Sequence, residues 1–239
     1  MFALARSEFS QIIRNRAVLI TTLIIPLASS AYFIFNREMF ENFDSNGYLG
    51  AILVFTIGVF SLYSGMVTIL AARRQNLFLK RLRSAAASDS SILAGLVTPI
   101  SVISLLQVIL VLGVFAAVTT MPENLPLLAL AIVATFAMAL ALGMATAGLT
   151  SSPEQAQVTT LPLSLGLIAV AIWVAITGTE NLTVLKRVVP GGSATELVAN
   201  AWDGGVPLAD SLILLVPTLA WVIVAIALAA RMFRWEPRR

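Results

Sequence analysis

Six long apolar runs divide the chain, and short polar stretches separate them. A helix rises about 1.5 Å per residue, so about 20 apolar residues cross a hydrocarbon core of about 30 Å. The runs are continuous rather than alternating, which favours helices over the strands of a membrane barrel. The pattern therefore predicts an all-α integral membrane protein that forms a single domain over residues 1–239. The predicted transmembrane helices cover residues 17–36, 49–72, 92–118, 125–149, 158–177 and 208–230.

Two shorter segments beside the apolar runs are amphipathic. In residues 2–16, FALARSEFSQIIRNR, apolar side chains gather on one helical arc, which predicts a helix in the membrane interface. The segment 73–83, RRQNLFLKRLR, holds five of the chain's fifteen Lys and Arg residues, and Phe78 and Leu82 lie on the arc opposite most of them. We expect a second short helix over about residues 74–86. Binding to lipid headgroups and contact with a partner protein both explain these segments.

The distribution of Lys and Arg predicts which ends face the cytoplasm. If the N-terminus lies inside, the inner segments hold twelve of these residues and the outer segments hold three. Basic residues favour the inner side, so both termini are expected to be cytoplasmic, in the plasma (inner) membrane. The alternative for the first run is the core of a signal peptide, since Arg14 and Arg16 precede it. The length of the run, Pro26 within it and the lack of a following A-x-A site favour a retained span.

Composition supports lipid as the main solvent of the chain. Hydrophobic residues make up 59% of the chain and charged residues 11%, and the mean hydropathy is +0.94. The net charge is +3, and the basic residues lie beside apolar runs, which favours membrane lipids over nucleic acid as partners. The chain has no Cys and no His, which excludes disulfides, Cys/His zinc sites and histidine triads.

The spans lack any group that would drive transport. None of the six apolar cores holds Asp, Glu, Lys or Arg, and Gln107 is the strongest polar group. Transporters driven by ions usually carry such a charged group. The chain also lacks the G-x-x-x-x-G-K-[ST] loop of ATPases, since Lys80 and Lys186 each follow a leucine. We therefore expect no enzyme activity, metal or cofactor in this chain, with ATP and Mg on a separate ATPase polypeptide.

Local patterns predict two helix starts and one packing face. Ser152 and Pro153 have the N-cap and first helical positions of the fifth span. Between the fifth and sixth spans, residues 193–196 have capping-box spacing, so a short helix is expected to begin there and to end at Gly204. Small residues at positions 139, 143 and 147 form a stripe on the fourth span, which predicts close helix packing.

An ordered set of features resembles the permease subunit of type-2 ABC transporters. The set comprises the first amphipathic segment ending in Arg-Asn-Arg, the proline in the first span, the R-x(6)-K-R-L-R segment after the second, and LGMATAGLTSSPEQAQ at the exit of the fourth. Six spans with cytoplasmic ends complete the resemblance, which extends over essentially the whole chain.

The resemblance implies two sites and two partners. In that family the segment after the second span is a coupling helix that contacts a separate ATPase subunit, and a second permease copy, identical or related, completes the assembly. The family also has short external helices near the exit route. On this chain the coupling helix corresponds to Leu77, Phe78, Lys80, Arg81, Leu82 and Arg83, and the external helix to Glu196, Leu197 and Trp202. Simple loop packing is the alternative for the external helix.

These features predict the membrane-spanning subunit of an ATP-driven ABC exporter. The uncharged walls favour a hydrophobic or amphipathic cargo, such as a drug, an antibiotic peptide or a lipid, moved outward. The alternative is a membrane scaffold or sensor that recruits a cytoplasmic partner without transport.

Overall fold

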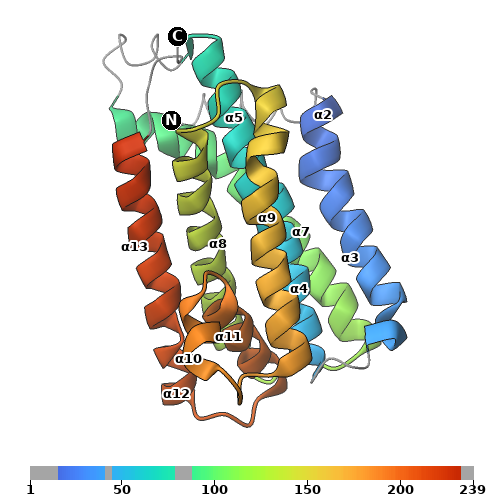
Figure 1. Cartoon of the computed structure of the whole chain (residues 1–239). Coiled ribbons are helices and arrows are strands. Elements are labelled where there is room, and N and C mark those ends of the chain that lie inside the picture. Colours follow the sequence, from blue (N-terminus) through green and yellow to red (C-terminus); the bar gives the residue numbers. More distant parts are fainter. Residues whose placement is uncertain (1–15, 41–44, 79–87, 233–239) are drawn as a thin grey trace.

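The structure is a computed structural model that describes residues 16–40, 45–78 and 88–232, and every regular element in these ranges is a helix (Figure 1). This confirms the all-α prediction for the described part of the chain. The predicted interfacial helix over residues 2–16 lies outside the described residues, apart from Arg16. In chain order the helices are α2 (Arg16–Leu19), the π-helix η1 (Ile20–Ile24), α3 (Ile25–Phe35), the 3-10 helix η2 (Arg37–Phe40), α4 (Asn46–Ile57), the π-helix η3 (Gly58–Tyr63), α5 (Ser64–Gln75), α7 (Asp89–Val118), α8 (Leu125–Ala147), α9 (Pro153–Thr177), α10 (Thr183–Val188), α11 (Gly192–Asp203), α12 (Leu208–Ile213) and α13 (Leu215–Met232).

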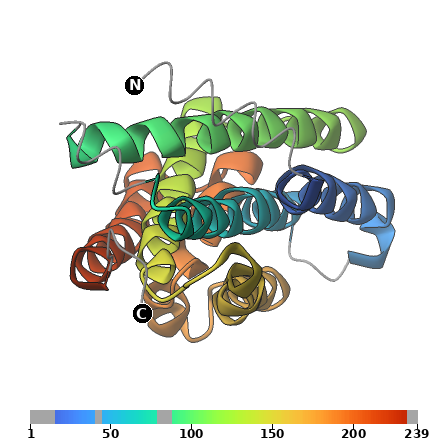
Figure 2. The ribbon, with the colours of Figure 1, turned by 90° about the horizontal axis from the view of Figure 1, so that it is seen from above.

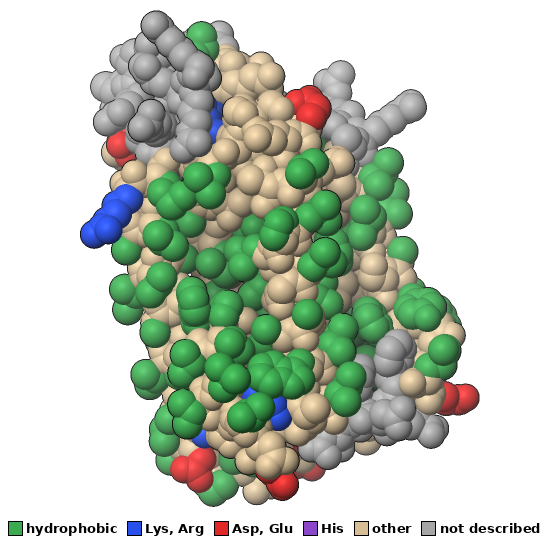
Figure 3. Space-filling model, in the orientation of Figure 1, with side chains coloured by type: hydrophobic (Ala, Val, Ile, Leu, Met, Phe, Trp, Pro, Cys, Tyr) green, Lys and Arg blue, Asp and Glu red, His purple; other side chains and the backbone are tan. Residues whose placement is uncertain are grey.

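Five helical segments of the described chain are long and apolar enough to cross a membrane. They cover Asn46–Gln75, Ser91–Val118, Leu125–Ala147, Pro153–Thr177 and Leu208–Met232. The first predicted span also forms a helix, in which Ile20–Phe35 is a shorter apolar stretch. A multi-pass membrane protein is therefore confirmed, whereas the count of six spans stays a prediction. On the face seen in Figure 3, hydrophobic side chains cover the middle of the molecule and charged side chains lie near its two ends.

The fifth span begins earlier than its apolar run. Helix α9 starts at Pro153, and the Ser152 hydroxyl accepts a hydrogen bond from the N–H of Gln155 at 3.2 Å, which confirms the predicted cap. The cap extends the helix beyond the predicted start at residue 158. It also places Glu154 in the first helical turn.

The last predicted span, residues 208–230, is divided in two. Helix α12 ends at Ile213 and α13 begins at Leu215. Pro217 has no N–H, so the carbonyl of Ile213 four residues earlier lacks its helical donor. The chain instead forms a tighter turn, in which the N–H of Leu214 donates to the carbonyl of Ser211 at 3.1 Å.

The second predicted span lies at the centre of the bundle. It runs as α4, η3 and α5 without interruption, and its residues 47–57 are all buried. Seen along the bundle in Figure 2, α7 lies on one side of it and α9 on the other. Helices α3, α8 and α11 also pack against it. This central helix therefore contacts the first span, α7, α8 and α9, whereas α13 packs mainly against α8.

The predicted packing face of the fourth span is confirmed. Ala139 and Ala147 on α8 are buried, and so is Gly143 between them. A Cβ at Gly143 would lie 3.2 Å from the carbonyl oxygen of Tyr63 and 3.3 Å from the Cβ of Met66. The missing side chain therefore lets α8 approach the central helix closely.

The two ends of the bundle differ in charge. Helices α2 and α9 begin, and α5 and α13 end, at one end, which we call the basic end (Figure 1). Helices α10, α11 and α12 lie at the opposite end, which we call the loop end. Described basic residues at the basic end are Arg16, Arg73, Arg74 and Arg231, and those at the opposite end are Arg37, Lys186 and Arg187. The assignment of the basic end to the cytoplasm stays a prediction.

Candidate functional site

The predicted coupling segment is described only at its start. Helix α5 continues through Arg74, which is buried, and ends at Gln75. Leu77 then has a left-handed backbone with φ +54°, so a second helix begins no earlier than Phe78. The Phe78 ring lies under the guanidinium of Arg73, whose Cζ is 5.3 Å from the ring centroid. Predicted contact residues Lys80, Arg81, Leu82 and Arg83 lie outside the described residues, so the ATPase contact stays a prediction.

The predicted external helix is present as α11, but its predicted cap is wrong. The helix starts after Gly191 without a side-chain cap and ends at Gly204, which has φ +70°. The Ser193 hydroxyl instead shares a hydrogen bond of 3.0 Å with the Thr218 hydroxyl on α13. Glu196 turns toward Arg187 on α10. Both side chains of the expected box therefore link α11 to neighbouring helices.

Two of the predicted exit residues belong to the bundle core. Leu197 is fully buried, and Trp202 is 1% exposed. The Trp202 ring centroid lies 5.1 Å from that of Phe115, and its Nε1 donates to the Thr120 hydroxyl at 3.3 Å. Helix α11 thus packs inward against α4 and α8. A role of these residues in an exit route stays a prediction.

Charged groups fasten α10 across the loop end. The Lys186 ammonium is buried and donates to the carbonyl of Gly178 at 2.6 Å, at the C-terminus of α9, where the helix dipole favours a cation. Arg187 donates from Nε and Nη2 to the two oxygens of Glu196 at 2.8 and 2.6 Å. These bonds raise the pKa of Arg187 above its ordinary value. Trp221 of α13 adds a bond from Nε1 to the carbonyl of Val188 at 2.7 Å.

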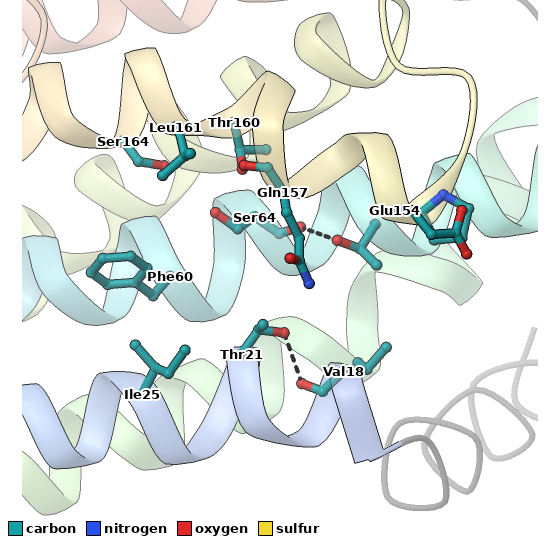
Figure 4. Close-up of a pocket in the computed structure, with 12 residues that line it drawn as sticks. Val18, Thr21, Ile25, Phe60, Ser64, Glu154, Gln157, Thr160, Leu161 and Ser164 are labelled. Carbon is teal, nitrogen blue, oxygen red and sulfur yellow. Dashed lines mark hydrogen bonds between the residues drawn. The ribbon is translucent and has the colours of Figure 1, made fainter.

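A groove opens between the first span and α9, with the central helix as its floor (Figure 4). From residue 47 to residue 71 every side chain of the central helix is buried except Phe60, Ser64 and Thr68. These three residues are spaced by four, so they share one helical face. The groove has a volume of about 420 Å³, within the range of small-molecule sites.

The two walls of the groove are helical stripes of different character. The first-span wall presents Val18, Thr21 and Ile25. The α9 wall is more polar and presents Pro153, Glu154, Gln157, Thr160, Leu161 and Ser164. Because Glu154 and Val18 lie near the starts of their helices, the groove reaches the basic end (Figure 4). The lining therefore combines apolar surface with hydroxyl and amide groups and one carboxylate.

A polar contact holds the first span against α7. The Gln107 side chain, 4% exposed, donates from Nε2 to the carbonyl of Thr22 at 3.0 Å. Thr22 lies in the π-helix η1. Ser61 in the second π-helix and Ser104 on α7 share a bond of 2.8 Å. The strongest polar group of the apolar cores thus positions one wall of the groove.

Comparison with known proteins finds one family. The model of the ABC-2 type transporter family matches residues 1–176, which is more than half of the chain. The matched range includes the first span, the central helix, α7, α8 and nearly all of α9, and therefore all three sides of the groove. No curated protein and no solved structure matches the chain.

Proposed function

The chain belongs to the ABC-2 type transporter family, and from this premise we propose that it exports a hydrophobic or amphipathic cargo with energy from a separate ATPase subunit. It is a transmembrane subunit of an ABC transporter. The expected assembly holds two permease copies and two ATPase subunits, in the plasma (inner) membrane. In this arrangement the basic end and both termini face the cytoplasm, and six spans cross the membrane.

The placement of charge supports an external source of energy. In the described spans, charged side chains occur only near helix ends, at Arg73, Arg74, Glu154, Asp210 and Arg231. A transporter coupled to protons or sodium generally needs an ionisable or ion-coordinating site near mid-membrane. Motion of an ATPase at the basic end would act on α5, the part of the central helix at that end, and so move the whole central helix. The proposed contact is Leu77 and Phe78 together with Lys80, Arg81, Leu82 and Arg83.

The groove is the observation that carries the cargo assignment. It is lined by three spans, reaches the basic end and has the size of a small-molecule site. Its floor belongs to the central helix, so a shift of that helix moves the floor relative to both walls. Apolar residues such as Phe60 and Ile25 face polar ones such as Gln157, which suits an amphipathic molecule better than a fully polar one.

Two measurements test this function. Capture of the chain from its native membrane, followed by mass spectrometry, is expected to recover a polypeptide with the G-x-x-x-x-G-K-[ST] loop. Inverted vesicles that contain both polypeptides are then expected to accumulate cargo only with hydrolysable ATP. Capture of the ATPase without any ATP-dependent uptake, over a panel of hydrophobic and amphipathic compounds, would instead indicate a scaffold.

A further inference from the structure

Three hydroxyls of the groove lining have their protons engaged within their own helices, so they present hydrogen-bond acceptors to a bound molecule. Thr21 donates its hydroxyl proton to the carbonyl of Val18 at 3.1 Å, and Thr68 donates to that of Ser64 at 2.9 Å. Thr160 donates more weakly within α9, at 3.4 Å. A hydroxyl has one proton and two lone pairs, so these three residues offer only lone pairs to a bound molecule. A ligand with N–H groups can therefore donate to these three hydroxyls, and the amide of Gln157 both donates and accepts.

Ser164 marks the deep end of the α9 wall. Its side chain is 2% exposed, and its Oγ has no hydrogen-bond partner among the described residues. A buried hydroxyl left unpaired costs about 1–3 kcal/mol, so the site is costly when empty. Ten residues separate Ser164 from Glu154 along α9, which corresponds to about 15 Å of helix. A molecule of this length reaches from the mouth to the unpaired hydroxyl.

Among the described residues that line the groove, Glu154 is the only one with a charged side chain. It lies in the first turn of α9, where the helix dipole favours a carboxylate. Its side chain is exposed and makes no ion pair with another described residue. This carboxylate therefore favours a cation over an anion at its own position in the mouth of the groove.

We propose that the groove binds an amphipathic cation with N–H groups, such as a long-chain amine. The ammonium lies at Glu154, the apolar body lies against Phe60, Ile25 and Leu161, and a second polar group about 15 Å away bonds to Ser164. This inference rests on the proposed function, because it assigns a cargo class to the same groove.

Direct binding tests the charge class without transport. The purified chain is placed in nanodiscs of phosphatidylcholine, whose headgroup has no N–H. Three fluorescent probes share a dansyl sulfonamide and an alkyl chain, and end in a primary ammonium, a trimethylammonium or a neutral acetamide. The wild-type chain is expected to bind the primary ammonium most tightly. Equal affinity for the primary ammonium and the acetamide overturns the inference, and ATP-dependent uptake of other cargo would still stand.

Two substitutions locate the binding groups. Glu154→Gln is expected to weaken binding of the primary ammonium by about 1.5-fold to fivefold, the range for an exposed ion pair, and to leave the acetamide probe unchanged. Glu180→Gln removes an exposed carboxylate outside the groove and is expected to change neither. Ser164→Ala is expected to weaken all three probes while raising thermal stability, because it removes an unpaired buried hydroxyl. An unchanged ammonium preference in Glu154→Gln overturns the inference.

A second lipid composition identifies the source of the ligand. Phosphatidylethanolamine carries the same ammonium N–H chemistry on an apolar body, as free amphipathic amines do. If the lipid is the occupant, nanodiscs that contain it weaken probe binding by competition. If a free amine is the occupant, the probe affinity is the same in both lipids. Both results support the inferred chemistry, and each assigns one source.

Discussion

The ion pair between α10 and α11 is expected to respond unequally to loss of its two partners. The Glu196 side chain is 7% exposed, whereas that of Arg187 is 39% exposed. Arg187→Met leaves a buried carboxylate with Thr179 as its remaining donor, at 3.2 Å. Removal of one partner of a buried pair costs about 3–5 kcal/mol, and the exposure of Arg187 places this case near the lower figure.

Glu196→Gln is the matched change, because it keeps the shape and one acceptor oxygen, turns the other oxygen into an NH2 donor and removes the charge. Arg187 then turns toward water, so the expected cost is about 1 kcal/mol. In a chain of this length, 1 kcal/mol corresponds to about 2–4 °C in the unfolding midpoint. Arg187→Met should therefore lower the midpoint by about 6–12 °C and Glu196→Gln by about 2–4 °C.

Thermal unfolding of the purified variants in one detergent, followed by intrinsic fluorescence, measures both shifts. The protein has four tryptophans, and Trp202 and Trp221 belong to or contact the helices that this pair joins. Equal shifts, or a larger shift for Glu196→Gln, would refute the reasoning from unequal burial. The double variant is expected to recover part of the loss, since no buried charge is then left unpaired.

Two further predictions concern packing and the first span. Gly47→Ala should destabilise the chain by about 2 kcal/mol, because the new Cβ would lie 2.7 Å from the carbonyl oxygen of Ala199. Gly113→Ala is the control and should leave stability unchanged, because its Cβ would meet open space. Equal denaturation midpoints for the two variants would contradict this prediction. Gln107→Leu removes the bond to Thr22, worth about 1 kcal/mol, and should loosen the first span with little change in overall stability. Because the chain has no native cysteine, spin labels on cysteines introduced at residues 28 and 165 report the distance between the first span and α9. A distance distribution in Gln107→Leu that is no broader than in the wild type would contradict the role of Gln107 in holding the first span.

The long spans are predictable from the chain because an apolar run of about 20 residues has few other solutions in lipid. Their ends depend on local chemistry. Ser152 and Pro153 could be recognised as a helix start, and Pro217 inside the last run is the signal for the break at Leu214. The apolar run alone predicts a continuous helix here, because proline in a transmembrane helix more often bends the helix than divides it.

The groove was not predictable, since its lining comes from three separate segments and uses residue types that also fill membrane cores. Only Ser64 and Thr68, spaced by four in the second run, hint at a polar face. The Glu196 side chain also pairs with Arg187 instead of capping its own helix as the spacing of residues 193–196 predicts. Arg187 is nine residues earlier on another helix and offers a charged donor, which is a stronger partner than a backbone N–H.

Blocking the groove tests the central claim most directly. Ser64→Trp places a large ring on the floor of the groove, and Thr21→Trp places one on the first-span wall. Val133→Trp adds the same ring to an exposed position on α8 outside the groove. The measurement is ATP-dependent uptake into inverted vesicles, with ATPase capture as the control for assembly. We predict that both groove variants capture the ATPase but lose uptake, and that Val133→Trp keeps both. Full uptake by the two groove variants would contradict the account.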